Sequence, residues 1–411
     1  MSEEEETLGL FEGFGIELEY MIVSRETLDV APVCDRLLHS ASGSYDPEIE
    51  QGELAWSNEL VLHVVELKTN GPAPSLDGLA VQFANGVGRA DELLRPHEAR
   101  LMPTAMHPWM DPAREARIWP HEYNAVYEAF DRIFDCSGHG WSNLQSAHLN
   151  LPFSGDDEFA RLHAAIRMLL PILPALAASS PVVDGRPTGI LDNRLEYYRS
   201  NARRIPAITG RVIPERADSR AEYQREILAP MYRAIAPHDP DGILQNEWLN
   251  ARGAIARFDR DAIEIRVLDV QECPLADLAI ARIAVAALRD LVGERWVGMD
   301  ELRAWPLEPL EQILLAAARS AEEAVISDPA YLSAFGMSGR SSGRAGELWR
   351  HIVEVSSVPG SDDEARALET LVGSGSLARR IARALAAGRD LRGLYEELCQ
   401  CLVEGRLFGW S

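Results

Sequence analysis

The chain has 411 residues, of which 46% are hydrophobic and 25% are charged, values typical of a globular protein able to bury a large core. Its formal net charge of −24 at pH 7 argues against nucleic acid and anionic membrane surfaces as partners, because phosphate contacts need clustered lysine and arginine. Lysine is scarce and arginine abundant, which suits bidentate recognition of carboxylate and phosphate and also fits a GC-rich genome.

The N-terminus is acidic and lacks the basic and apolar regions of a signal peptide. We therefore expect an acidic disordered tail over 1–8, followed by a single catalytic domain over 9–411 in a cytoplasmic protein. No apolar run is long enough to span a membrane. Five cysteines without a C-x-x-C pair indicate neither a zinc site nor a disulfide framework, and Cys399 and Cys401 are expected to be small core residues.

The first part of the chain is expected to form strands. Residues 13–23 predict a strand, and residues 59–67 form a β-branched run that ends at Asn70-Gly71-Pro72. A helix is predicted over 75–95. Residues 96–121, rich in proline, histidine and tryptophan, predict a long functional loop.

Further along, residues 143–151 predict a strand, and 157–170 predict a helix extended or kinked by Pro171 and Pro174. Residues 180–220 are expected to be irregular, and 262–269 give the last clear strand pattern. From residue 275 onward the sequence predicts helices, with 275–292 apolar nearly all round and 338–346 a mobile loop. Strands followed by helices indicate the α+β class, with a sheet-forming part over about 9–274 and a helical part over about 275–411.

Two carboxylates on one strand face suggest a metal. Successive strand residues point to opposite faces, so Glu17 and Glu19 share a face. Such carboxylates repel each other unless a cation lies between them, and Mg²⁺ or Mn²⁺ prefers oxygen ligands. An exposed strand face is the alternative interpretation of the same tripeptide.

Acidic and basic residues recur on the other predicted strands. Glu59 and Glu66 bracket one run, but they are seven residues apart and would face opposite sides unless a bulge intervenes or Glu59 precedes the ladder. His148 and Asn150 share a face, as do Glu264 and Arg266. An enzyme that activates a carboxylate with ATP needs such carboxylates for two or three Mg²⁺ ions, and arginines for phosphate and substrate carboxylates.

These segments, in this order, make the sequence resemble the second type of glutamate–cysteine ligase and the related carboxylate–amine ligases. The matching pieces span about 15 to 271: Gly15-Ile16-Glu17-Leu18-Glu19-Tyr20-Met21, Glu59 and Glu66, Leu101-Met102-Pro103 to His107-Pro108, Gln145-Ser146-Ala147-His148-Leu149-Asn150, Thr188-Gly189 with Asn193-Arg194, and Glu264-Ile265-Arg266-Val267-Leu268-Asp269-Val270-Gln271.

The resemblance implies a glutamine-synthetase-like fold, in which a curved antiparallel sheet holds metals and substrates and helices lie behind it. It implies that ATP phosphorylates the γ-carboxylate of glutamate and that an amine such as cysteine attacks the acyl phosphate. Mapped onto this chain, the resemblance makes Glu17, Glu19, Glu59, Glu66, His148 and Glu264 the metal ligands, and it assigns phosphate or glutamate contacts to Arg194 and Arg266.

Several assignments are left open. Asn150 stands where many family members carry a histidine, and it is expected to bind Mg²⁺ or substrate. Arg252 and Arg257 flank a strand-like segment and fit either phosphate ligands or surface ion pairs. The segment 195–201 departs from the family pattern and is a candidate lining for a different acceptor amine. The resemblance is also compatible with a homodimer.

Two other function classes are weighed against the ligase. A paired-carboxylate hydrolase such as a glycosidase would need two carboxyl groups about 5 to 9 Å apart and neither ATP nor arginines. A binding or scaffold protein would keep the fold but show gaps among the metal ligands.

Overall fold

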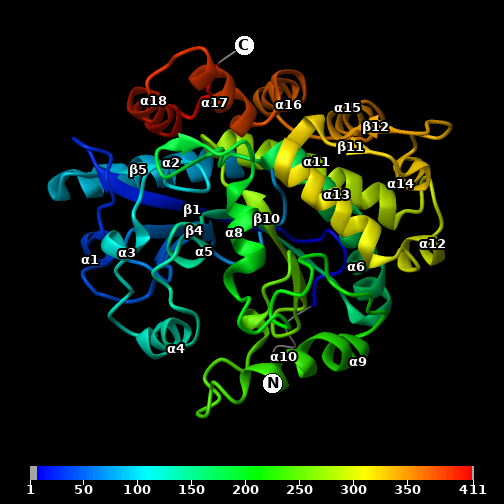
Figure 1. Cartoon of the computed structure of the whole chain (residues 1–411), viewed down its shortest axis with the longest axis horizontal. Helices are drawn as coiled ribbons and strands as arrows, with labels where there is room; N and C mark the ends of the chain where they lie inside the picture. Colours follow the sequence, from blue (N-terminus) through cyan, green and yellow to red (C-terminus); the bar gives the residue numbers. More distant parts are fainter. Residues whose placement is uncertain (1–6, 410–411) are drawn as a thin grey trace.

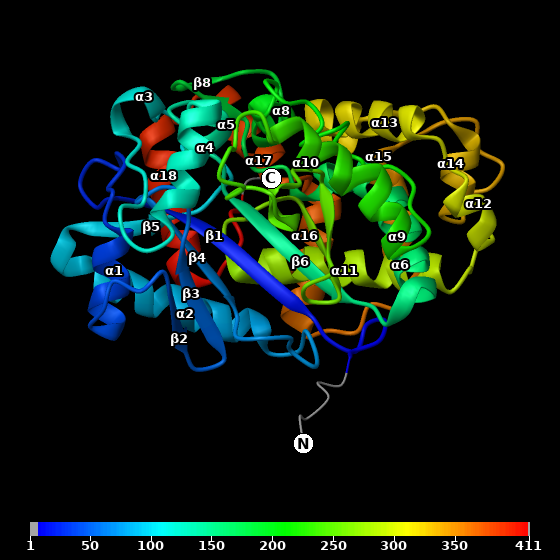
Figure 2. The same cartoon turned by 90° about the horizontal axis from the view of Figure 1, so that it is seen from below.

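One antiparallel sheet organises the chain, and the strands that form it come from residues 15 to 269. The structure is a computed structural model that describes residues 7–409, so residues 1–6 of the predicted acidic tail lie outside the described part. The sheet has the order β2-β3-β4-β1-β6-β10-β9, and β5 also pairs with β1. Figure 2 shows the long β1 and β6 side by side. The strands are β1 (Gly15–Ser24), β2 (Glu48–Gln51), β3 (Leu54–Asn58), β4 (Val64–Thr69), β5 (Ala99–Met102), β6 (Ser146–Pro152), β9 (Ala254–Arg257) and β10 (Ala262–Asp269).

Helices occupy most of the remaining chain. Up to residue 235 they are α1 (Cys34–Ser42), α2 (Leu79–Leu94), α3 (Pro112–Glu115), α4 (Asn124–Phe134), α5 (His139–Ser142), α6 (Gly155–Leu169), α7 (Pro174–Ala177), α8 (Asn193–Asn201), α9 (Arg220–Tyr223) and α10 (Ala229–Ile235). The later helices are α11 (Pro274–Val292), α12 (Met299–Arg303), α13 (Leu307–Ser320), α14 (Pro329–Ala334), α15 (Ala345–Val355), α16 (Asp362–Ser374), α17 (Leu377–Ala386) and α18 (Leu391–Glu404). In Figure 1 the last three lie together at the top of the molecule. No helix within residues 7–409 is long and apolar enough to cross a bilayer.

The predicted α+β class is confirmed, because every strand pair of the sheet is antiparallel and the chain from 274 onward is mainly helical. The predicted strands over 13–23, 143–151 and 262–269 correspond to β1, β6 and β10. The two-residue strands β11 (Val325–Ile326) and β12 (Gly343–Arg344) interrupt the helical part, and α15 begins inside the segment expected to be a loop.

Three local predictions were wrong. The run 59–67 is not one strand, because β3 ends at residue 58 and β4 begins at residue 64. The expected loop 96–121 contains β5 and α3. The expected irregular stretch 180–220 contains the two-residue strands β7 (Val182–Val183) and β8 (Arg186–Pro187) and the helix α8, which begins where the Asp192 carboxylate accepts a hydrogen bond from the Leu195 amide at 2.7 Å.

The apolar face of the sheet packs against helix α2. Alternation along β1 places Ile16, Leu18 and Tyr20 on this face, all of them buried. A Cβ atom on Gly86 of α2 would lie 2.9 Å from Leu54 Cδ1, so glycine allows the helix to approach the sheet closely. This face belongs to the main hydrophobic core of the protein.

A second core covers the far end of the other face of β1. The side chains of Met21 and Val23 point to the face of β1 opposite to that of Tyr20. They belong to one hydrophobic cluster with Leu377 and Ile381 of α17. Leu398 and both Cys399 and Cys401 of α18 belong to the same cluster, as the sequence predicts for the two cysteines. All five cysteines are buried and free.

An ion pair without solvent exposure ties α17 to the end of β10. Arg380 Nη1 lies 2.6 Å from Glu272 Oε1 and 2.7 Å from the Phe408 carbonyl oxygen, and neither side chain is exposed. Replacing Arg380 by methionine leaves the Glu272 carboxylate buried without its partner, so we expect a loss of about 3–5 kcal/mol of unfolding free energy.

The measurement is thermal and urea unfolding of Arg380→Met beside Arg379→Met. Arg379 pairs with Glu322 at 2.6 Å in a partly exposed position, and its removal should cost about 1 kcal/mol or less. Equal losses in the two variants would contradict the structural role of the buried pair.

Candidate metal and substrate site

The polar face of the sheet is built from side chains that stand in rows across neighbouring strands. Antiparallel partners point to the same face, so the register decides which residues meet. One row joins Glu48, Ser57, Glu66 and Glu19 across β2, β3, β4 and β1. The next row joins Lys68, Glu17 and His148 across β4, β1 and β6, and a third joins Gly15, Asn150 and Glu264 across β1, β6 and β10.

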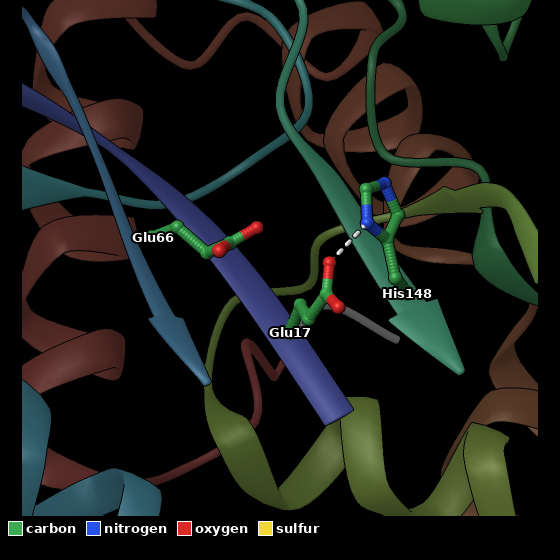
Figure 3. Close-up of side chains that lie close together, drawn as sticks. All are labelled: Glu17, Glu66 and His148. Atoms are coloured by element: carbon green, nitrogen blue, oxygen red, sulfur yellow. Dashed lines mark hydrogen bonds and ion pairs between the residues drawn. The ribbon is translucent and has the colours of Figure 1, made fainter. Parts of the chain in front are cut away.

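His148 is the centre of these contacts. Its Nδ1 lies 2.7 Å from Glu17 Oε2, as Figure 3 shows, and 3.7 Å from Glu264 Oε1. Its Nε2 lies 2.8 Å from the Ser146 hydroxyl and 3.7 Å from Glu19 Oε1. The imidazole therefore lies among three carboxylates from two neighbouring strands.

Glu17 and Glu19 each accept further hydrogen bonds from β6. The Asn150 amide donates to Glu17 Oε1 at 3.0 Å, and the Ser146 backbone N–H donates to Glu19 Oε2 at 2.7 Å. Asn150 packs directly against Gly15, where an added Cβ would lie 2.9 Å from the Asn150 Cβ. Glycine at position 15 therefore leaves space for Asn150, whose amide donates a hydrogen bond to Glu17.

Two groups of side chains are compact enough to hold a cation. Glu17, Glu66 and His148 offer ligand atoms within 4.8 Å of one another, and so do Glu19, Glu59 and Glu66. Glu66 belongs to both groups, and Figure 3 shows it extending from β4 toward Glu17. Carboxylate oxygens with an imidazole suit Mg²⁺ or Mn²⁺. The donor set therefore fits two neighbouring divalent ions that share one carboxylate.

Glu59 reaches this site from outside the sheet ladder. It follows β3 and precedes β4, so the sequence alternative in which it lies before the ladder is correct and no bulge is involved. Burial, and then the charges of Glu19 and Glu66, raise the pKa of Glu59 well above its usual range. The neutral form of Glu59 is consequently favoured when no cation is bound.

The other groups of the cluster also have shifted pKa values. Burial raises the pKa of Glu17, but the hydrogen bond and charge of His148 outweigh it and hold that pKa well below its usual range. Burial and the charge of Glu17 raise the pKa of Glu66 to about 7. Burial lowers the pKa of His148, but Glu17 outweighs it and raises that pKa to about 9. A protonated imidazole thus takes the place of a cation.

Glu264 is held by two of the predicted arginines. Arg266 Nε donates to Glu264 Oε1 at 2.9 Å, and Arg257 Nη1 lies 3.5 Å from Oε2. Arg257 also forms a bidentate pair with Asp259. Arg257 and Arg266 therefore lie beside the metal-capable groups, at the β10 side of the site.

Arg194 and Arg252 lie away from these carboxylates. Arg194 of α8 is buried, with Nη1 3.5 Å from Asp269 Oδ1 and Nη2 2.7 Å from the Arg266 carbonyl oxygen. Arg252 Nη2 donates to Glu215 Oε1 at 2.8 Å, which is the ion-pair alternative considered for this residue. Within residues 7–409, the structure brings together the six predicted metal ligands, Asn150, Arg257 and Arg266, but it pairs Arg194 and Arg252 with other acids.

The segment 195–201 forms most of α8, and its Tyr198 side chain lies near two arginines of the predicted site. The Arg194 guanidinium carbon lies 5.7 Å from the centre of the Tyr198 ring. Burial lowers the pKa of Arg266, but the charge of Glu264 and the neighbouring Tyr198 outweigh it and raise that pKa above its usual range. Tyr198 is therefore the residue of this segment that lies beside Arg266.

Sequence reasoning missed three residues of the site, namely Lys68, Ser57 and Ser146. Lys68 Nζ lies 3.1 Å from Glu66 Oε1, and the Ser57 hydroxyl donates to the same oxygen at 2.8 Å. Ser146 holds Glu19 and His148 as described above. Lys68 and Ser146 each stand two residues from a predicted ligand, so strand alternation is the signal that could have found them.

Comparisons with known proteins identify the family of this chain. The model of a protein family described as glutamate–cysteine ligase family 2 matches residues 13–400. The chain belongs to glutamate–cysteine ligase family 2.

Two relatives extend over nearly the whole of this family member. An uncharacterized protein of Archaeoglobus fulgidus is 32% identical over 400 residues, covering 96% of this chain and 99% of the relative. A Sorangium cellulosum protein, provisionally named glutamate–cysteine ligase 2, is 24% identical over 404 residues, covering 95% and 97%. The family assignment therefore holds for both the sheet and the helical part.

A solved structure shares the fold. The crystal structure of glutamate–cysteine ligase from Francisella tularensis in complex with AMP superposes with a TM-score of 0.62 at 14% sequence identity, covering 97% of this chain and 89% of that chain. The predicted architecture, an antiparallel sheet with helices packed behind it, is confirmed by this likeness.

The shifted pKa values predict how stability depends on pH without metal. Folding raises the pKa of His148 from 6.5 to about 9 and that of Glu66 from 4.5 to about 7, so the folded state binds more protons than the unfolded state between these limits. The stabilisation due to protonated His148 is complete below about pH 6.5 and is lost as pH rises through about 9. In EDTA, the melting temperature should therefore fall between pH 6.5 and 9.

Scanning calorimetry of the protein and of His148→Gln checks this prediction. The variant keeps hydrogen-bonding capacity but cannot gain the proton, so its melting temperature should change less over this range. The buried His63, His107 and His163 act in the opposite direction, because burial lowers their pKa values to about 4, about 4 and about 3. Their contribution to stability rises with pH up to about 7 and is constant above it, and it is the same in both proteins. An equal fall in both proteins would assign the pH dependence to other groups.

Proposed function

We propose that this protein is an ATP-dependent carboxylate–amine ligase that forms a γ-glutamyl amide through an acyl-phosphate intermediate. The observation that carries the proposal is the pair of cation-capable groups sharing Glu66 on one sheet face, in a member of glutamate–cysteine ligase family 2. The likeness to a glutamate–cysteine ligase solved in complex with AMP supports a nucleotide substrate.

The metal ligands in this proposal are carboxylates and one histidine. One ion would be held by Glu17, Glu66 and His148, and a neighbouring ion by Glu19, Glu59 and Glu66. Bound Mg²⁺ or Mn²⁺ would supply charge neutralisation for the phosphate oxygens of ATP. Glu264 is the sixth predicted ligand. It lies beside the first group, because its Oε1 atom is 3.7 Å from Nδ1 of His148.

The arginines of β9 and β10 supply the anion contacts. Arg257 and Arg266 lie at the edge of the acidic cluster, where guanidinium groups can bind a phosphate or the substrate carboxylates bidentately. Asn150 holds Glu17 through its amide and cannot act as acid or base, so we assign it to ligand positioning. Arg194 and Arg252 act on the site only through their neighbours in this arrangement, since both are paired with other acids.

Glutamate and cysteine are the leading substrates, with another amine as the alternative acceptor. Tyr198 of α8 lies beside Arg266, so this helix is the element we assign to acceptor choice. A glycosidase-like hydrolase is disfavoured because the carboxylates form compact cation-capable groups bordered by arginines, whereas a hydrolase needs two carboxyl groups flanking a sugar groove.

A substrate panel tests the reaction. We expect sustained ADP release only when ATP, Mg²⁺, a carboxylate such as glutamate and an amine such as cysteine are present together. ATP and the carboxylate form the acyl phosphate, and the enzyme can turn over again only after the amine has consumed that intermediate. Coupled ADP assay and product mass spectrometry identify the amide. No ADP release across a panel of carboxylates and amines, with Mg²⁺ and with Mn²⁺, would sink the ligase proposal.

A second prediction concerns Glu19. In Glu19→Gln the neutral amide weakens cation binding, so turnover should fall by about 100-fold or more. The metal-free melting temperature should stay the same or rise, because one charge is removed from beside Glu59 and Glu66. The Mg²⁺-induced rise in melting temperature should shrink.

The matched control is Glu92→Gln, which changes an exposed glutamate on α2 that pairs only loosely with Arg89 at 3.5 Å. This variant should keep both activity and the Mg²⁺ effect. Full activity in Glu19→Gln would remove Glu19 from the metal site.

A further inference from the structure

Lys68 is the only lysine in the chain. The other 39 of the 40 lysine and arginine residues are arginines. Position 68 is thus the one place in the sequence where the basic side chain is an ammonium group and not a guanidinium. Lys68 lies on β4, directly across from Glu17 on β1 and two residues from Glu66.

The lysine contacts one oxygen of the carboxylate that both cation-capable groups share. Lys68 Nζ lies 3.1 Å from Glu66 Oε1, and Ser57 donates to the same oxygen at 2.8 Å. Nζ also lies 2.7 Å from Glu48 Oε2, which anchors the ammonium from the edge strand β2. Both donors take Oε1, so neither of them occupies the Oε2 atom of Glu66. Figure 3 shows the carboxylate directed toward Glu17.

Two arginines of this chain show how a guanidinium binds both oxygens of a carboxylate, whereas Arg266 takes only Oε1 of Glu264. Arg199 binds both carboxylate oxygens of Glu196, at 3.0 and 2.9 Å. Arg257 does the same with Asp259, at 3.0 and 2.8 Å. A guanidinium is a planar fork that matches both oxygens, whereas an ammonium is a compact point charge. An arginine at position 68 is therefore able to cover Glu66 Oε2 as well, which an ammonium group on Oε1 does not do.

We propose that Lys68 is a positioning residue that fixes Glu66 through Oε1 and leaves Oε2 to the metals, and that this role requires lysine rather than arginine. The inference rests on the proposed function, because it concerns the metal site of that function. Lys68 lies outside the motifs that carry the family resemblance. Its proposed role, which is to orient the Glu66 carboxylate, is therefore additional to the proposed function.

The test compares Mg²⁺ binding, measured by isothermal titration calorimetry, in the wild-type protein, Lys68→Arg and Arg379→Lys. We expect Lys68→Arg to bind Mg²⁺ about tenfold more weakly with an unchanged metal-free melting temperature. Arg379→Lys exchanges the same two side chains at a partly exposed ion pair with Glu322 and should bind Mg²⁺ like the wild type. Wild-type affinity in Lys68→Arg would overturn the inference.

A second measurement needs no variant. Protein grown with ¹³C-labelled lysine has one Cε–Hε signal in its NMR spectrum, because Lys68 is the only lysine. Mg²⁺ should shift this signal saturably, over the same concentrations as the calorimetric isotherm. A signal that stays in place while calorimetry shows Mg²⁺ bound would overturn the role of Lys68 and leave the proposed function standing. A wild-type protein that binds neither Mg²⁺ nor Mn²⁺ would instead overturn the proposed function, and this inference with it.

Discussion

Glu17, Glu19, Glu66 and Glu264 project from one face of one sheet, and their repulsion must be offset before the chain can fold. Every one of them is mostly buried, where an unpaired charge is costly. Without metal, the offset comes from protonated His148, from Lys68 and from the arginines beside Glu264. The raised pKa values of Glu59 and Glu66 also favour the neutral forms of these two carboxyl groups. Positive side chains and bound protons therefore neutralise the carboxylates when no metal is present. Metal binding must release these protons and displace the positive side chains from the ligand atoms. Folding of these strands is stabilised by their opposite, apolar face, which packs in the main hydrophobic core.

Strand alternation sorts the two faces. On β1, Leu18 and Tyr20 enter the main core, while Glu17 and Glu19 enter the site. Because neighbouring strands are in register, the rows of polar residues across β4, β1 and β6 depend on every strand keeping its alignment. A shift of one residue in any of them would exchange core and site side chains, so the metal site and the hydrophobic core specify the same register.

Local patterns were enough to predict the central strands and the acidic face. The alternation in Glu17-Leu18-Glu19 predicts a shared face, and the apolar run of 275–292 predicts the buried helix α11. Other elements have no local pattern. Helix α8 is polar along most of its length and is held by the Asp192 cap, and β5 is a four-residue strand that includes Arg100. The contacts of Lys68 with Glu48 and of Arg252 with Glu215 join residues far apart in sequence or on strands that were not predicted, so only the fold reveals them.

The cover on Met21 and Val23 has a consequence for synthesis on the ribosome. These residues belong to the first strand made, but the helices that bury them begin at Leu377. At roughly 5–20 residues per second, translation of the intervening chain takes roughly 20–70 seconds. During that interval the apolar end of β1 lacks the two helices that cover it in the folded protein. Nascent chains therefore expose the apolar end of this strand until α17 and α18 have been made.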